Sequence, residues 1–184
     1  MRPRIVLPVL LALALIVLVP VWTGLDSPRS DSTSIPPAVS ICFTPGGACD
    51  SLLVQAIHAA RFSIRVAAYS FTSAPIADAL IAAQARGVDV RVVLDAGRRN
   101  GRGHQGDRLR QAGVDVRYDD EHAIMHNKFM VLDLATVITG SYNYTTAAQR
   151  RNAENMALIR DAAVAEEYAE EWTLHWGHSS QEGA

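Results

Sequence analysis

The chain has almost no lysine: of its 17 basic residues only Lys128 is a lysine, and all the others are arginines. It also lacks an excess of either charge, since 17 Lys and Arg oppose 19 Asp and Glu, which excludes a globally basic protein that coats nucleic acid. Two cysteines are too few for a disulfide-stapled miniprotein or a four-thiolate zinc site. With 49% apolar and 20% charged residues, the 184-residue chain is expected to form one folded domain.

The N-terminus combines a short basic start with a long uncharged run. Arg2 and Arg4 precede residues 5–22, which contain no charged side chain. This pattern predicts a signal peptide or an N-terminal membrane anchor over residues 1–25. Both readings remain open, because no A-x-A cleavage site follows and the run approaches the ~20 residues that span a bilayer. In either case we expect the rest of the chain to be extracytoplasmic, either periplasmic or secreted, or tethered to the membrane by its anchor.

Composition divides the remainder into a linker, a domain and a tail. Residues 26–38 are rich in Ser, Pro and Asp and predict a linker, residues 39–178 carry the regular patterns of a domain, and residues 179–184 form a tail. Cys42 and Cys49 flank a turn-forming stretch, and in an oxidising compartment a disulfide between them is more plausible than two free thiols.

Two hydrophobic periods alternate along the domain. Helical spacing predicts helices that begin at caps Asp50 and Ser73, a short helix around Leu109, and an amphipathic helix over residues 162–176. Apolar runs predict strands over residues 39–43, 62–71, 88–94, 114–118, 129–132, 136–139 and 156–159. Strand–helix alternation in the first half and short strand connections in the second predict an α/β fold, with a mixed β-sheet sandwiched by helices.

The chemically most informative residues are His126 and Lys128. They stand two apart at the entrance to an apolar strand, so their side chains should project from one face, with Cα atoms about 6.6 Å apart. One phosphate-sized anion could contact both. A lone lysine could fall anywhere by chance, but beside His126 it suggests a site that favours a compact ammonium over a planar guanidinium.

Polar groups follow two further apolar runs. Ser141 and Asn143 come after the strand over residues 136–139, and Glu154 precedes the strand over residues 156–159. A histidine, a lysine, an amide and a carboxylate at strand ends outline a phosphoryl-transfer site, in which the carboxylate can fix the imidazole tautomer.

The run H-x-K-x4-D, from His126 to Asp133, followed by G-S-x-N, from Gly140 to Asn143, resembles the signature of the phospholipase D superfamily. The single motif and the leader are most similar to its bacterial secreted endonuclease branch. The resemblance extends from about Ile41 to Trp176 and implies the phospholipase D/nuclease-like fold.

The resemblance also implies a role for each motif residue. His126 would be the nucleophile that forms a phosphohistidine, and Lys128 and Asn143 would hold the non-bridging oxygens. Ser141 would line the same pocket, and Glu154 would orient a histidine.

Three further expectations follow from the same resemblance. Asp133 would be mainly structural. Because the superfamily uses two such motifs and this chain has one, a homodimer should bring two copies of His126 and Lys128 into one site. No metal and no cofactor would be needed, since the paired lysines supply the positive charge.

Several residues outside the motif have competing interpretations. His122 and His126 have the spacing of a helical metal pair, but Ala123 replaces the glutamate of H-E-x-x-H and the surroundings look extended, so zinc catalysis is disfavoured. His175 and His178 are expected at the surface. An arginine cluster is either an electropositive lip for a polyanion or an ordinary solvated loop: Arg98, Arg99, Arg102, Arg108 and Arg110.

The expected function is therefore a metal-independent phosphodiesterase, foremost a non-specific endonuclease on DNA or RNA, because only phosphates would be gripped. The alternative keeps the chemistry and makes the substrate a phospholipid, with phosphatidylcholine cleaved to phosphatidate near the membrane. A minor alternative is a non-catalytic anion-binding module.

Overall fold

The structure, a computed structural model, describes residues 38–181. The expected leader over residues 1–25, the linker up to residue 37 and the last three residues of the tail lie outside this range. Within it, no helix is both long and apolar enough to cross a membrane. The elements are β1 (Val39–Thr44), α1 (Cys49–Ala59), β2 (Ser63–Ala68), α2 (Ala74–Ala85), β3 (Asp89–Asp95), α3 (Gly106–Gln111), β4 (Asp115–Asp119), β5 (Lys128–Leu132), β6 (Thr136–Gly140), α4 (Thr146–Arg150), β7 (Glu154–Arg160) and α5 (Ala162–His178).

All seven strands join one sheet in the order β1-β7-β6-β5-β2-β3-β4. Strands β2, β3 and β4 are parallel neighbours, joined by crossovers that contain α2 and α3. The pairs β2–β5, β5–β6, β6–β7 and β7–β1 are antiparallel. The predicted mixed sheet is confirmed.

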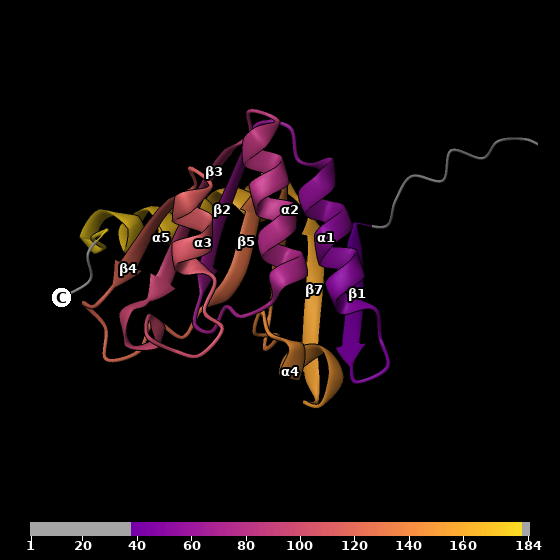
Figure 1. The fold of residues 1–184 in the computed structure, drawn as a ribbon. Coiled ribbons are helices and arrows are strands. Elements are labelled where there is room, and N and C mark those ends of the chain that lie inside the picture. Colours follow the sequence, from indigo (N-terminus) through magenta and orange to yellow (C-terminus); the bar gives the residue numbers. More distant parts are fainter. Residues whose placement is uncertain (1–37, 182–184) are drawn as a thin grey trace, which may run out of the picture. The chain divides into compact units, whose positions relative to one another are not determined.

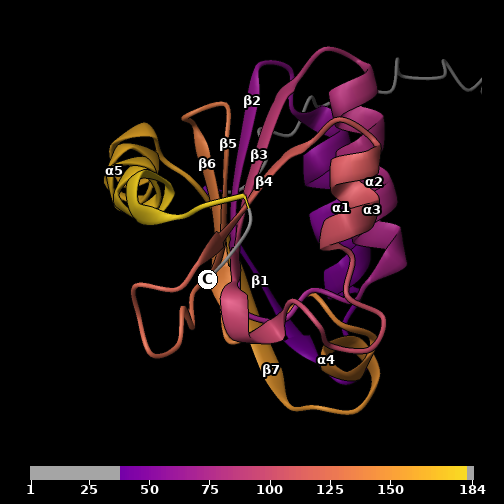
Figure 2. The ribbon, with the colours of Figure 1, turned by 60° about the vertical axis from the view of Figure 1, so that its left-hand side comes forward.

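Helices cover both faces of the sheet, as Figures 1 and 2 show: α1, α2 and α3 lie on one face and α5 lies on the other. Strand β5 is buried throughout, and its side chains alternate between two cores. Met130 and Leu132 pack into the core under α1 and α2, whereas Phe129 and Val131 pack with Trp172 of α5. Burial on both faces explains why this strand reads as a continuous apolar run.

The start of α1 differs from the expectation. Its N-cap is Ala48, and Asp50 lies in the first helical turn instead of capping the helix. Cys49 is bonded to Cys42 of β1, and Gln149 accepts a hydrogen bond from the backbone N–H of Asp50. The disulfide and the contact with the distant Gln149 fix the helix start, which local capping preference alone placed too late.

The short helix α4 was not expected from the sequence. It has five residues, too few to show a helical period. Thr145 caps it by accepting a hydrogen bond from the backbone N–H of Ala148.

Candidate active site

Three strand ends meet at one edge of the sheet. Strand β5 begins at Lys128, its antiparallel neighbour β6 ends at Gly140, and β7, antiparallel to β6, begins at Glu154. Gly140 has φ +149°, and a Cβ there would lie 2.3 Å from the backbone oxygen of Asn155. Only glycine permits this close approach of β6 and β7, which brings the residues after Gly140 next to Glu154.

His126 and Lys128 meet around Tyr69, the residue that follows β2. The His126 ring is exposed, and its centroid lies 4.6 Å from that of Tyr69. The Lys128 ammonium lies 5.0 Å from the Tyr69 ring centroid and donates to the backbone oxygen of His126 at 2.5 Å. Lys128 is only 8% exposed, and burial lowers its pKa while the nearby Glu154 opposes that shift. A poorly solvated ammonium therefore stands beside an accessible imidazole.

Glu154 is held by two neighbours. Its carboxylate accepts the Ser141 hydroxyl at 2.6 Å and the Asn152 amide at 2.9 Å. Ser141 in turn accepts the backbone N–H of Asn155 at 3.0 Å. The hydroxyl proton of Ser141 thus points at Glu154, and within one chain Glu154 orients this serine. The expected role of Glu154, orienting a histidine, stays a prediction.

Asn143 presents an amide at the edge of a groove. Its side-chain oxygen is buried and has no hydrogen-bond partner among residues 38–181. Buried polar atoms without partners are rare and commonly mark a ligand site. The groove has a volume of about 440 Å³ and is lined by Tyr69, Ser70, Thr72, Arg98, Asn143, Thr145, Thr146, Ala147, Arg151 and Asn152.

The sequence interpretation gave no role to Tyr69 or Arg151, and placed Arg98 only in a cluster. Arg98 lies over the Tyr69 ring, 4.4 Å from its centroid, and donates to its hydroxyl. By contrast, Arg108 forms an ion pair with Asp78. The arginines of the cluster therefore differ: Arg98 lines the groove, whereas the charge of Arg108 is paired with Asp78. In the sequence, Tyr69 falls inside the expected strand over residues 62–71, where nothing distinguishes it from a packed aromatic residue.

Asp133 lies at the other end of β5 from Lys128. Its carboxylate accepts backbone N–H groups from Arg61, Phe62 and Ser63 at 2.9, 2.7 and 2.9 Å. Burial would raise the pKa of Asp133, but these hydrogen bonds outweigh it and the pKa is lowered. Asp133 thus ties the loop before β2 to the turn after β5.

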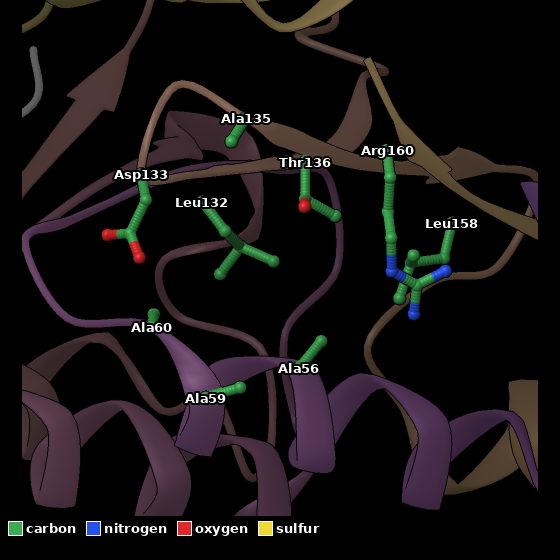
Figure 3. Close-up of a pocket in the computed structure, with 9 residues that line it drawn as sticks. All are labelled: Ala56, Ala59, Ala60, Leu132, Asp133, Ala135, Thr136, Leu158 and Arg160. Carbon is green, nitrogen blue, oxygen red and sulfur yellow. The ribbon is translucent and has the colours of Figure 1, made fainter. Parts of the chain in front are cut away.

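A second cavity, shown in Figure 3, lies beside Asp133. It has a volume of about 160 Å³. Its walls are mostly small and apolar side chains between α1 and the ends of β5 and β6: Ala56, Ala59, Ala60, Leu132, Asp133, Ala135, Thr136, Leu158 and Arg160. Because it adjoins the Asp133 end of β5, this cavity is separate from the His126 and Lys128 site.

The histidines near the C-terminus correct one expectation. His175 is 5% exposed, not a surface residue, and with His178 and His122 it surrounds Asp119. Residues 120–127 form no helix, so the helical metal pair of His122 and His126 does not form. Sequence spacing could not reveal this cluster, because β4 and α5 meet only in the folded sheet.

Comparison with known proteins places these observations in a family. Residues 53–176 match the family described as "Cardiolipin synthase, PLD-like domain". A protein named phospholipase D from Rickettsia prowazekii is 44% identical over 134 residues, which cover 73% of this chain and 65% of that protein. A mitochondrial cardiolipin hydrolase from Canis lupus familiaris is 36% identical over 147 residues, covering 79% of this chain and 58% of that protein. The chain thus spans about two thirds or less of these relatives' lengths.

Among solved structures, Nuc from Salmonella typhimurium, described as a phospholipase D family member, is 37% identical with a TM-score of 0.74. The match covers 77% of this chain and 95% of Nuc. It confirms the expected α/β nuclease-like fold. Together with the matched family over most of the domain, these likenesses show that the chain belongs to the phospholipase D superfamily.

Proposed function

We propose that the protein is a phosphoric diester hydrolase in which His126 attacks phosphorus. The observation that carries this proposal is the accessible His126 ring beside the buried Lys128 ammonium, next to the groove that Asn143 lines. The names of the relatives, phospholipase D and cardiolipin hydrolase, support the same reaction class.

The reaction runs in two steps. An unprotonated nitrogen of His126 forms a bond to phosphorus, the bond to the leaving oxygen breaks, and that oxygen takes a proton from a general acid. Water then attacks phosphorus and gives a proton to the group that acted as the acid, while the bond between phosphorus and His126 breaks and the imidazole is regenerated. Lys128 and the amide N–H of Asn143 stabilise the charge on the non-bridging oxygens without any metal ion or other cofactor.

The general acid is the second His126 of a homodimer. Within one chain, three other histidines contact Asp119, namely His122, His175 and His178. His104 accepts the backbone N–H of Gly106 and lies beside the Tyr118 ring, and His58 stands near the end of α1. A two-fold assembly would place two copies of His126 and Lys128 at one phosphate, one imidazole as nucleophile and the other as acid.

Nucleic acid is the proposed substrate. The groove beside Asn143 carries Arg98 and Arg151 and is lined mainly by polar side chains, as a phosphodiester backbone requires. Contacts to phosphates alone carry no base information, so we expect cleavage of DNA and RNA with little sequence preference.

A phospholipid is the second candidate substrate. The names of the relatives favour it, and so does the exposed side chain of Ile124, two residues before His126, which could touch a lipid surface. A third reading, a non-catalytic anion-binding module, would require that His126 has no role in turnover.

One comparison separates these candidates. The purified full-length protein is incubated with plasmid DNA, with RNA and with vesicles of phosphatidylcholine or cardiolipin, each with EDTA. We expect nicked plasmid and degraded RNA, while release of choline or phosphatidate with intact plasmid would reverse the substrate assignment. A requirement for added Mg²⁺, Mn²⁺ or Ca²⁺ would contradict the metal-independent chemistry. Equal turnover by His126→Ala and wild type would establish the binding-module reading.

The assembly is tested by light scattering on the same preparation. We expect a particle of twice the 19.9 kDa chain mass. Full activity in a particle of one chain mass would contradict the shared site.

We also propose that the domain works outside the cytoplasm. The Cys42–Cys49 disulfide supports an oxidising compartment, since cytosolic thiols are kept reduced. Cell fractionation checks this, and recovery of the protein in the cytosol with both thiols alkylatable would overturn it.

A further inference from the structure

Four side chains from three parts of the chain converge beside the loop that leads to His126. Asp119 ends β4, His122 lies in the following loop, and His175 and His178 lie in the last turn of α5. One carboxylate oxygen of Asp119 is 2.8 Å from Nδ1 of His175, 3.1 Å from Nε2 of His178 and 3.3 Å from Nδ1 of His122. One ligand atom from each residue lies within 4.8 Å of the others.

We propose that Asp119, His122, His175 and His178 bind one Zn²⁺ ion. Three imidazole nitrogens and a carboxylate oxygen form a ligand set that zinc accepts in tetrahedral geometry. With bonds of about 2.0–2.1 Å, neighbouring ligand atoms of a tetrahedron stand about 3.3–3.4 Å apart. The three nitrogen–oxygen separations lie near that value, and the imidazole nitrogens, all within 4.8 Å of one another, would draw together around the ion.

Contacts behind His175 support a metal ligand. Its Nδ1 faces Asp119, while its Nε2 lies 3.2 Å from the carboxylate of Glu171 and 3.0 Å from the amide nitrogen of Asn127. The Glu171 carboxylate favours a hydrogen on Nε2, and with the Asn127 amide turned by 180° its oxygen accepts from that hydrogen as well. In a neutral imidazole this leaves Nδ1 as a lone pair for a metal. Ligating histidines commonly donate their other N–H to a carboxylate in this way.

Burial and access also fit an ion. The Asp119 side chain is fully buried and that of His175 is 6% exposed, whereas His178 and His122 are 28% and 48% exposed. The site thus has a buried inner side and a partly exposed outer side through which an ion can enter. Residues 161–184 contain six acidic residues and no Lys or Arg, so this part of the chain also favours a cation.

The ion would have a positioning role and would not take part in the phosphodiester chemistry. It would tie α5 to loop 120–127, which runs directly into His126, and the Asn127 amide already contacts His175. This connection is independent of the substrate assigned above.

Metal binding by the full-length protein without a histidine tag tests the site. Protein stripped with a chelator is titrated with Zn²⁺ by calorimetry, and its thermal unfolding is followed with and without the ion. We expect one Zn²⁺ per chain and a higher Tm with zinc. Co²⁺ substitution should give the intense visible absorption of a four-coordinate ion.

Three variants locate the ion without removing the buried Asp119, whose loss could prevent folding. His178→Ala and His122→Ala, at partly exposed positions, should abolish or strongly weaken binding. Glu171→Gln should weaken it by about 10–100-fold. Two matched controls, His58→Ala at an exposed histidine and Glu170→Gln on the same helix, should bind as wild type does.

Two results would overturn the proposal. One is wild-type protein that binds no Zn²⁺, which would leave the three imidazoles as hydrogen-bond partners of Asp119 only. The other is zinc bound equally by wild type and by the double variant His122→Ala/His178→Ala.

Discussion

The motif from His126 to Asp133 spans strand β5, and its polar groups at the two ends of the strand differ in how many hydrogen-bond partners they have. At the end that begins with Lys128, the ammonium is buried among few partners, His126 is exposed and the Asn143 oxygen has no partner among the described residues. At the other end, about 13 Å away along the strand, the Asp133 carboxylate is met by three backbone N–H groups.

Within one motif, the groups at the Lys128 end are available to a ligand, whereas Asp133 stabilises the fold. Polar groups left unsatisfied by the fold retain their capacity to bind a ligand, whereas a fully hydrogen-bonded carboxylate has none to spare. We therefore expect changes at the Lys128 end to lower turnover with little change in stability, and changes at Asp133 to do the reverse.

The largest effect is expected for His126→Ala. Loss of the nucleophile should lower kcat by about 10³-fold or more, as for other covalent catalysts. Because the ring is exposed, the urea midpoint should stay near that of wild type. Acid-labile labelling with radioactive substrate phosphate should trap an adduct in wild type and none in the variant. A labelled His126→Ala protein would show that another residue is the nucleophile.

The second largest effect is expected for Lys128→Met. Its kcat should be about 10²–10³-fold lower, because the variant lacks the preorganised positive charge that faces the non-bridging oxygens. Lys128→Arg should not restore the rate, since Lys128 is only 8% exposed and a larger, planar guanidinium would fit poorly there. Steady-state kinetics on a small diester measure both variants. Turnover equal to that of wild type in either variant would contradict the proposed role of Lys128.

Asp133→Asn tests the expectation that the other end of β5 contributes to stability and not to turnover. Loss of charge-assisted hydrogen bonds should lower the free energy of unfolding by about 1.5–3 kcal/mol, with kcat unchanged below the melting range. The folded-state pKa lies below the ordinary 3.8, so this stabilisation is present above about pH 4 and is lost as the pH falls through the folded pKa. Urea unfolding of both proteins at pH 7 and near pH 3 should show the gap closing in acid. A gap that widened in acid would contradict this origin.

The smallest effect is expected for Arg98→Gln. This change removes one positive charge from the groove, so KM for DNA should rise and the slope of log affinity against log salt should fall by about one. Turnover of a small diester should not change. Arg108→Gln is the matched control, because Arg108 is already paired with Asp78. If the slope of log affinity against log salt is the same for both variants, Arg98 does not contact the DNA backbone.

Much of the fold follows from local pattern. Strand β5 reads as four consecutive apolar residues because both of its faces are buried, and α5 shows a helical period because only one of its faces packs on the sheet. Local pattern fails at α4, which is too short to show a period, and at Asp50, where a disulfide and a distant glutamine fix the helix start.

The candidate site, too, is only partly predictable from local sequence. The spacing of His126 and Lys128 on one chain segment was enough to predict that the two lie together, as they do around Tyr69. Tyr69, which contacts both, was given no role, because it reaches them through the pairing of β2 with β5.

The order and spacing of nearby residues were enough to predict the layered α/β class, the superfamily and the placing of His126 beside Lys128. Only the tertiary structure decided that Ser141 engages Glu154, that Arg98 borders the groove while Arg108 does not, and that three histidines gather on Asp119. The physical reason is that such contacts join strands and helices far apart along the chain, and their geometry is set by sheet order and register, which no local pattern encodes.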